Sequence, residues 1–297
     1  MKQMNKKHTK RNAVILAVLV FLIVIPTLFI GIFAVLTSFM STAEMNEYYG
    51  MIRNGLGIGE YAKIHLIPDK VSFEQYISTL WESSDFWFYF WNSVLYSLPA
   101  MFVSCIIAVL GGYAFAKFNF PLRRFWLMVY IVIMMIPYQV IIPPNTLVLE
   151  KLGLLDTRAA LIIPNFFTAF GTYLLYQFIS YIPDEIIEQA RVDGANEIRI
   201  LCRIIIPNAM SGIISFFILY CVDLWNMIEQ PLTYLKDEFK YPLSAALEYF
   251  ESSGVGTGSV CSIIFTLPAV LAFIIWKDYL ILGIKNTIVT GAGKNRG

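Results

Sequence analysis

Very few residues inside the long apolar stretches of this chain have side chains that could do chemistry. Asp223 lies near the end of one such stretch, and an aromatic ring and an amide follow it at Trp225 and Asn226. A carboxylate in an apolar segment is costly, so it is a candidate for function. Aromatic faces stack on sugar rings, while amide and carboxylate groups pair with hydroxyls. These three residues are therefore candidates for lining a substrate pathway.

Two other interpretations of these residues stay open. Asp223 also fits a buried, hydrogen-bonded pair at a helix interface. Trp225 equally fits the belt of tryptophans that marks the boundary of a membrane.

No group of residues indicates an enzyme. The two histidines, His8 and His65, lie far apart in the sequence, and the four cysteines are scattered without a CxxC pair. Scattered cysteines in apolar segments are typical of small buried side chains, not of a disulfide framework or a metal site. We therefore predict no catalytic residue and no metal ligand.

A phosphate-binding loop is also missing. The nearest match to GxxxxGK[ST] is Gly293 with Lys294, but Ile288 stands where the first glycine is needed. Asn295 stands where Ser or Thr would bind magnesium. We therefore expect no ATPase site and no cofactor in this chain.

The most polar stretch is residues 181–207. Pro183 and the two acids after it predict a helix start, Gly194 predicts the end of that helix, and Asn196 predicts the cap of a second helix over 198–206. The less polar side of the first helix is expected to contain Ile186, Ile187, Ala190 and Gly194. An amphipathic helix on the membrane surface and a docking element for a partner both fit this pattern.

This stretch resembles the signature loop of ABC importer permeases, which reads Glu-Ala-Ala, three residues, Gly, nine residues, Ile-x-Leu-Pro. Every spacing is kept, with Gln189 in place of the first alanine and Ile206 in place of leucine. The longer string, residues 188–207, is similar to that of carbohydrate importers of the maltose type. The resemblance implies that the ATPase-coupling residues are Glu188, Gln189, Ala190, Asp193, Gly194 and Pro207.

The resemblance extends over nearly the whole chain. Trp225-Asn226 with Pro231-Leu232 is similar to the Trp-Asn-x-x-x-x-Pro-Leu string of carbohydrate permeases. The strings at 111–121 and 134–144 look like the second and third helices of the family, and residues 290–294 resemble its C-terminal motif. Together these motifs indicate the second-permease type of the maltose-like importers.

Composition independently places the chain in a membrane. It is 58% hydrophobic and 14% charged, whereas soluble domains carry about 25% charged residues. The net charge of +1 implies no nucleic-acid partner. A bilayer span needs about 20 apolar residues. Six stretches meet this length or nearly so, at residues 13–43, 86–116, 125–149, 159–183, 204–228 and 252–276.

The predicted fold is therefore an all-α membrane protein with six transmembrane helices and a cytoplasmic coupling loop, 181–207, between helices 4 and 5. Basic residues concentrate on the side of the N-terminus, so both termini and the coupling loop are expected in the cytoplasm. The predicted segments are a cytoplasmic tail (1–12), the first transmembrane helix (13–43), an extracytoplasmic loop (44–85), a five-helix permease core (86–283) and a cytoplasmic C-terminal tail (284–297).

The resemblance implies a permease subunit of an ATP-driven, binding-protein-dependent importer in the cell membrane, for an oligosaccharide or related solute. The implied partners are a homologous permease subunit, two ABC ATPase subunits that bind ATP and Mg²⁺, and an extracytoplasmic solute-binding protein. The main alternative is a self-sufficient secondary transporter or channel, which Asp223 alone favours. A polyol, a glycerol-phosphate-like compound and a peptide-like solute also stay open.

Overall fold

The structure is a computed structural model that describes residues 2–54 and 65–294, with side chains described for residues 18, 20–50 and 65–278. Every regular element in these ranges is a helix, which confirms the predicted all-α fold. The chain divides into two units. Unit 1 contains residues 1–86 and 247–265, and unit 2 contains residues 87–246 and 266–297.

Unit 1 is held together by contacts between the first and last long helices. Thr37 Oγ1 and Ser259 Oγ lie 2.9 Å apart, and Ser38 Oγ lies 2.9 Å from the Tyr76 hydroxyl. A small core of Met40, Met45 and Tyr49 packs beside them. The elements of this unit are α1 (Lys2–Ser38), α2 (Thr42–Asn54), α3 (Glu74–Ile77), the π-helix Ser78–Glu82, the end of α14 (Leu243–Ser253) and the start of α15 (Val255–Lys294).

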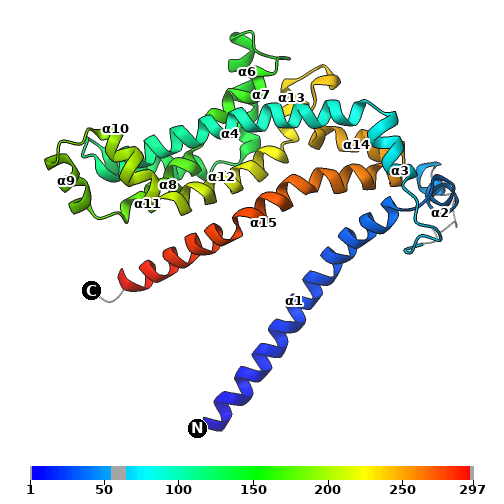
Figure 1. Ribbon diagram of the computed structural model, residues 1–297, viewed down its shortest axis with the longest axis horizontal. Coiled ribbons are helices and arrows are strands. Elements are labelled where there is room, and N and C mark those ends of the chain that lie inside the picture. Colours follow the sequence, from blue (N-terminus) through cyan, green and yellow to red (C-terminus); the bar gives the residue numbers. More distant parts are fainter. Residues whose placement is uncertain (1, 55–64, 295–297) are drawn as a thin grey trace. The chain divides into compact units, whose positions relative to one another are not determined.

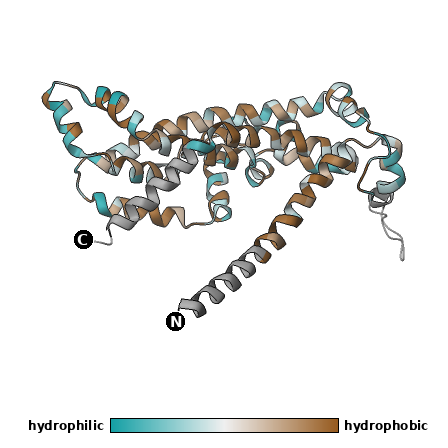
Figure 2. Ribbon diagram, turned by 60° about the horizontal axis from the view of Figure 1, so that its bottom comes forward, coloured by the Kyte–Doolittle hydropathy of each residue, from teal (hydrophilic) through white to brown (hydrophobic). Residues whose placement is uncertain are grey.

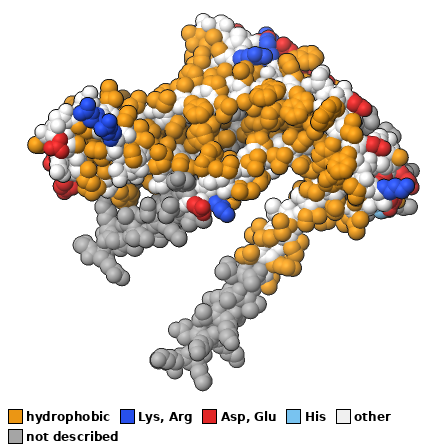
Figure 3. All heavy atoms as spheres, viewed as in Figure 1, with side chains coloured by type: hydrophobic (Ala, Val, Ile, Leu, Met, Phe, Trp, Pro, Cys, Tyr) orange, Lys and Arg blue, Asp and Glu red, His pale blue; other side chains and the backbone are white. Residues whose placement is uncertain are grey.

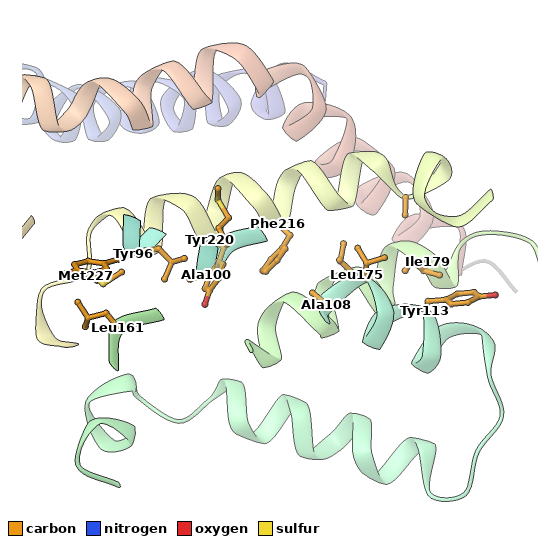
Figure 4. Packing of buried hydrophobic residues seen from close by; sticks show 14 of the residues in the cluster. Tyr96, Ala100, Ala108, Tyr113, Leu161, Leu175, Ile179, Phe216, Tyr220 and Met227 are labelled. Atoms are coloured by element: carbon orange, nitrogen blue, oxygen red, sulfur yellow. The ribbon is translucent and has the colours of Figure 1, made fainter. Parts of the chain in front are cut away.

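Unit 2 packs its helices around a continuous apolar core. Leu175 and Ile179 of α8 lie beside Ala108 and Tyr113 of α4, and Phe216 lies farther along (Figure 4). Its helices are α4 (Asp85–Lys117), α5 (Arg123–Met134), α6 (Tyr138–Lys151), α7 (Ala159–Ile162), α8 (Ala169–Ser180), α9 (Asp184–Val192), α10 (Glu197–Ile200), α11 (Ile206–Asn208), α12 (Met210–Trp225) and α13 (Glu229–Tyr234), with the start of α14 and the remainder of α15 (Figure 1).

Within the part of the chain that the structure describes, four helical segments are long and apolar enough to cross a membrane, and two bent helix pairs raise the number to as many as six. Many of their apolar side chains are exposed, and hydrophobic side chains form a broad surface in Figure 3. Apolar side chains can face outward in this way when the surroundings are lipid. Two of the six predicted spans, 125–149 and 204–228, are the ones that the structure shows as broken.

A proline lies close to each break. α5 and α6 meet at 101°, with Pro137 as the residue before α6. The helix over 197–208 meets α12 at 75°, two residues after Pro207. Proline lacks an N–H and clashes with the preceding turn, so a continuous helix is disfavoured there. Both of these predicted spans are therefore bent at a break and are not continuous helices.

The predicted terminal tails are largely helical where the backbone is described. α1 begins at Lys2 and α15 runs to Lys294, so both helices extend into the predicted tails 1–12 and 284–297. In the predicted outer loop 44–85, helices occupy part of the chain, and residues 55–64 lie outside the described residues.

The loop after α6 is fixed to the segment after α13. Asp156 accepts hydrogen bonds from the backbone N–H of Lys236 at 3.1 Å and of Asp237 at 3.2 Å. Its carboxylate also pairs with the Lys240 ammonium at 3.2 Å. These contacts, led by the Lys236 N–H, lower the pKa of Asp156. The loop is therefore a defined turn, with Asp156 itself at a φ of 58°.

Glycine allows α4 and α8 to approach closely. A Cβ atom added to Gly112 would lie 2.8 Å from the Tyr176 backbone nitrogen and 2.9 Å from the Leu175 carbonyl carbon. Backbone atoms of a packed helix cannot move aside cheaply, and small residues are how membrane helices achieve such contacts.

We predict that Gly112→Ala separates α4 from α8 and destabilises the chain by about 1–3 kcal/mol. Thermal unfolding of the purified protein in detergent measures this. Gly31→Ala is the matched control, because nothing lies within 4 Å of a Cβ at Gly31 and alanine favours a helix. Equal melting temperatures for the two variants would contradict the predicted close packing.

The polar helix α9 is fastened to the end of α4 by one buried cation. The Lys117 side chain is only 4% exposed, and its ammonium lies 2.6 Å from the Asp184 carboxylate, which is 73% exposed. The same ammonium donates to the Ile182 carbonyl at 2.5 Å. Lys117 therefore satisfies two acceptors where α8 ends and α9 begins.

We expect Lys117→Met to destabilise the chain by about 1–3 kcal/mol, because it removes a charged hydrogen bond and leaves the Ile182 carbonyl without this donor. Asp184→Asn is expected to cost less than about 1 kcal/mol, because the exposed carboxylate is replaced readily by water. Thermal unfolding of both variants tests the asymmetry. An equal or larger effect of Asp184→Asn would show that the buried bond to Ile182 is unimportant.

Candidate functional site

The segment 184–200 is a helix, a turn and a second helix. A glycine motif ends the first helix, and an asparagine caps the start of the second. α9 ends in a Schellman motif, in which the Ala195 N–H bonds the Ala190 carbonyl at 2.9 Å and the Gly194 N–H bonds the Arg191 carbonyl at 3.0 Å. Gly194 has a φ of +81°, a left-handed conformation that glycine adopts without strain. The Asn196 side chain then accepts the Arg199 N–H at 2.9 Å and caps α10.

The second helix differs slightly from the prediction. It begins at Glu197, one residue before the expected start, and a π-helical turn over Leu201–Ile205 joins α10 to α11. Gly194 and Asn196 occupy the predicted turn and cap positions. The segment is thus a compact unit with little freedom at its turn, which suits a part that must transmit movement.

One face of this segment is anchored in the core. Ile187 and Ile200 are 2% and 0% exposed, and Ala190 packs against the same cluster. Full burial of each isoleucine stabilises the arrangement by about 1.5–3 kcal/mol. A second anchor is polar, because the Tyr113 hydroxyl of α4 donates to Glu197 at 2.6 Å and Arg191 pairs with Glu197 at 2.8 Å.

The opposite face is exposed and mixed in character. Val192 and Ile198 are 87% and 71% exposed, and Ile186 is 46% exposed. Ile186 was expected on the less polar side with Ile187, and the structure corrects this by placing it on the exposed face. Exposed aliphatic side chains beside acids are typical of a surface that another protein covers. Figure 2 shows hydrophilic residues gathered on α9 and α10, in contrast to α12.

The six predicted coupling residues lie in this one region. The structure leaves five of them exposed and buries part of the sixth, Ala190. The exposed five are Glu188, Gln189, Asp193, Gly194 and Pro207. Glu188 and Asp193 are therefore accessible to a partner, whereas Ala190 serves the anchored face.

A second region of interest is a cavity of about 1040 Å³ in unit 2. It lies between the α5–α6 break, the turn that joins the 3-10 helix η2 (Pro164–Phe166) to α8, and the end of α12. Its wall is partly apolar, with Ile133, Phe167 and Phe170 among the lining residues. Ten polar side chains also line it, namely Tyr138, Gln139, Asn145, Asn165, Thr168, Tyr220, Asp223, Asn226, Glu229 and Gln230.

An amide pair supports the floor of this cavity. The Asn165 side chain donates to Gln230 at 2.7 Å and to the Leu161 carbonyl at 2.8 Å, and Gln230 donates back at 3.3 Å. The Tyr220 hydroxyl donates to the Asn165 carbonyl at 2.7 Å. These buried groups hold α7, α12 and α13 together, because breaking one bond would leave another polar group unpaired.

The three predicted pathway residues do not share one environment. Asp223 and Asn226 are exposed and line the cavity, so Asp223 is not a buried pair at a helix interface. Trp225 is 6% exposed, and its ring lies 5.7 Å from that of Phe90, away from the cavity lining. The expected role of Trp225 at the pathway is therefore not supported by its position, since consecutive helical residues point in different directions.

Sequence reasoning missed Asn165, Gln230 and Tyr220. Asn165 was detectable in principle, because it is a lone amide directly after a proline in the apolar run 159–167. Nothing in the sequence indicated that Gln230 would face it across 65 positions. Among the side chains that the structure describes, the lining contains two carboxylates, Asp223 and Glu229, and no basic residue.

Comparison with known proteins identifies the family of the chain. Residues 107–286, more than half of the chain, match the family described as binding-protein-dependent transport system inner membrane component. The arabinooligosaccharides transport system permease protein AraQ of Halalkalibacterium halodurans is 27% identical over 262 residues, which cover 86% of this chain and 90% of AraQ. The sn-glycerol-3-phosphate transport system permease protein UgpE of Escherichia coli K12 is 27% identical over 237 residues, covering 76% and 84%.

A solved structure shows the same fold. A chain of a bacterial ABC transporter involved in the import of the acidic polysaccharide alginate superposes with a TM-score of 0.74, covering 90% of this chain and 96% of that one at 23% identity. Family members are transport components that work with other subunits and a binding protein, and they are not enzymes. With the match over residues 107–286, the chain belongs to the binding-protein-dependent transport inner membrane components, the permease subunits of ABC importers.

Proposed function

We propose that this permease carries a neutral carbohydrate and is driven through residues 184–200 by separate ATPase subunits. The observation on which this proposal rests is the capped helix–turn–helix segment, anchored by Ile187 and Ile200 and exposed at Val192 and Ile198. A rigid element with one buried and one exposed face can pass the movement of a partner into the core.

The ATP-binding chemistry belongs to the partners in this proposal. The chain has no GxxxxGK[ST] string, so two ABC ATPase subunits would bind ATP and Mg²⁺. A homologous permease would complete the pathway, and an extracytoplasmic binding protein would deliver the solute. The concentration of basic residues on the side of the N-terminus supports a cytoplasmic location for both termini and for the 184–200 segment. Relatives that handle arabinooligosaccharides support a sugar as the solute.

The charge of the cavity narrows the solute class. One relative is named for sn-glycerol-3-phosphate and the structural neighbour for an acidic polysaccharide. Here Asp223 and Glu229 line the cavity without a basic residue. Two like charges repel an anion by about 2 kcal/mol each at ~8 Å and an effective dielectric constant near 20. A neutral oligosaccharide, whose hydroxyls pair with amides and carboxylates, fits this lining better.

Gly194→Glu is expected to abolish ATP-driven uptake, because it places a bulky charge on the exposed turn where the ATPase would pack. Gly153→Glu is the matched control: Gly153 also has a positive φ, +67°, and open space around it. Both variants carry similar backbone strain of about 1 kcal/mol. Uptake by the reconstituted transporter and co-purification of the ATPase are the measurements.

Wild-type uptake by Gly194→Glu would refute the coupling role. Loss of uptake in both variants would point to a general folding effect instead. A chain that transports without any co-purifying ATPase would favour a self-sufficient secondary transporter.

The pathway is tested by single cysteines in a chain whose four native cysteines are replaced. We expect a thiol-specific reagent to label Asn226→Cys and abolish uptake, because Asn226 lines the cavity. Glu238→Cys, exposed but outside the cavity lining, is the control that should be labelled without loss of uptake. A neutral oligosaccharide should protect Asn226→Cys, and a uronic-acid oligosaccharide should not. Protection by the acidic sugar alone would contradict the proposed solute class.

A further inference from the structure

A histidine and two carboxylates from separate parts of unit 1 meet at one point. His65 Nε2 lies 3.3 Å from Glu44 Oε1 and 3.5 Å from Asp69 Oδ1. All three ligand-type atoms lie within 4.8 Å of one another. Glu44 is in the first turn of α2, and His65 and Asp69 lie on the segment before α3. The sequence gives little sign of this grouping, because Glu44 lies far from the other two along the chain.

The imidazole nitrogen at the centre of the group has no hydrogen bond. His65 Nε2 is enclosed by the protein, and neither carboxylate accepts from it with hydrogen-bonding geometry. An enclosed nitrogen without a partner is costly. A bound cation between the two carboxylates would remove that cost, because it accepts the nitrogen lone pair and neutralises the acids.

The spacing fits a tetrahedral zinc ion. Zinc binds histidine nitrogen and carboxylate oxygen at about 2.0–2.2 Å, so neighbouring ligand atoms in a tetrahedron are about 3.3–3.6 Å apart. The distances from His65 Nε2 to the two carboxylate oxygens, 3.3 and 3.5 Å, lie in this range, and the two oxygens lie within 4.8 Å of each other. A histidine with two carboxylates suits zinc better than calcium, which takes oxygen ligands.

Each ligand is held in place by further contacts. The Tyr48 ring stacks on the His65 imidazole at 4.2 Å and an interplanar angle of 7°. The Tyr49 hydroxyl donates to the His65 carbonyl, and the Asp69 N–H donates to Glu44 Oε1 at 2.9 Å. Such outer contacts orient metal ligands. Glu44 is 6% exposed and Asp69 is 68% exposed, so the site is open to solvent on the Asp69 side.

We propose that Glu44, His65 and Asp69 bind one Zn²⁺, with a water molecule in the fourth position. The ion would join the start of α2 to the segment at 65–69. This proposal is independent of the transported solute, since it concerns unit 1 alone.

The test uses the untagged full-length chain in detergent. Metal analysis after dialysis against Zn²⁺ should find one zinc per chain, and X-ray absorption at the zinc edge should show only nitrogen and oxygen ligands near 2.0–2.2 Å. The wild-type spectrum reports the zinc ligands directly, so this part of the test does not require a variant that folds.

Two variants and one control locate the ion. His65→Asn and Glu44→Gln should weaken zinc binding at least roughly 10–100-fold, because loss of an outer contact alone has that effect. Glu47→Gln, an exposed acid on the same helix, should bind zinc as the wild type does. The proposal is overturned if the wild type retains no zinc, or if all three variants retain it equally. It is also overturned if pH alone, and not zinc, shifts thermal unfolding, because a protonated imidazole then pairs with the acids.

Discussion

Backbone hydrogen bonding in an apolar environment is the constraint on which the rest of this structure depends. Lipid offers no partner for a free N–H or carbonyl, so the chain must satisfy its backbone inside helices. The two broken segments obey the same rule. Near the α5–α6 break, the Met135 and Ile136 N–H groups still bond carbonyls three residues back, and Ala209 bonds Ile205 at 2.8 Å beside the second break.

The α5–α6 break contributes residues to the lining of the cavity. The residues on both sides of Pro137, Ile136 and Tyr138, line the cavity, as does the last turn of α12. A pair of straight helices would bury or expose these side chains along one face instead. Irregular backbone at membrane depth is tolerated where it lines a cavity or packs on protein. Pro137 interrupts the helical hydrogen bonding, and the cavity beside this break is lined by polar groups such as Asn165 and Asp223.

The segment 184–200 is both well ordered at its turn and exposed on one side. Its stiffness comes from local chemistry, with a glycine-based Schellman motif and an asparagine cap. Its position comes from distant contacts, because Lys117 and Tyr113 of α4 hold Asp184 and Glu197. In the function proposed above, a partner that moved this segment would pull on the end of α4, which contacts α8 through Gly112.

By itself the sequence determined the all-α class, the turn at Gly194, the cap at Asn196 and the family, because these depend on local propensity, hydropathy and spacing. Only the tertiary structure decided that Asp223 faces a cavity while Trp225 packs on Phe90. It also decided that Asn165 meets Gln230 and that Glu44 meets His65. Such contacts depend on how helices rotate and bend against one another. No local pattern encodes a contact between residues that are far apart in the chain.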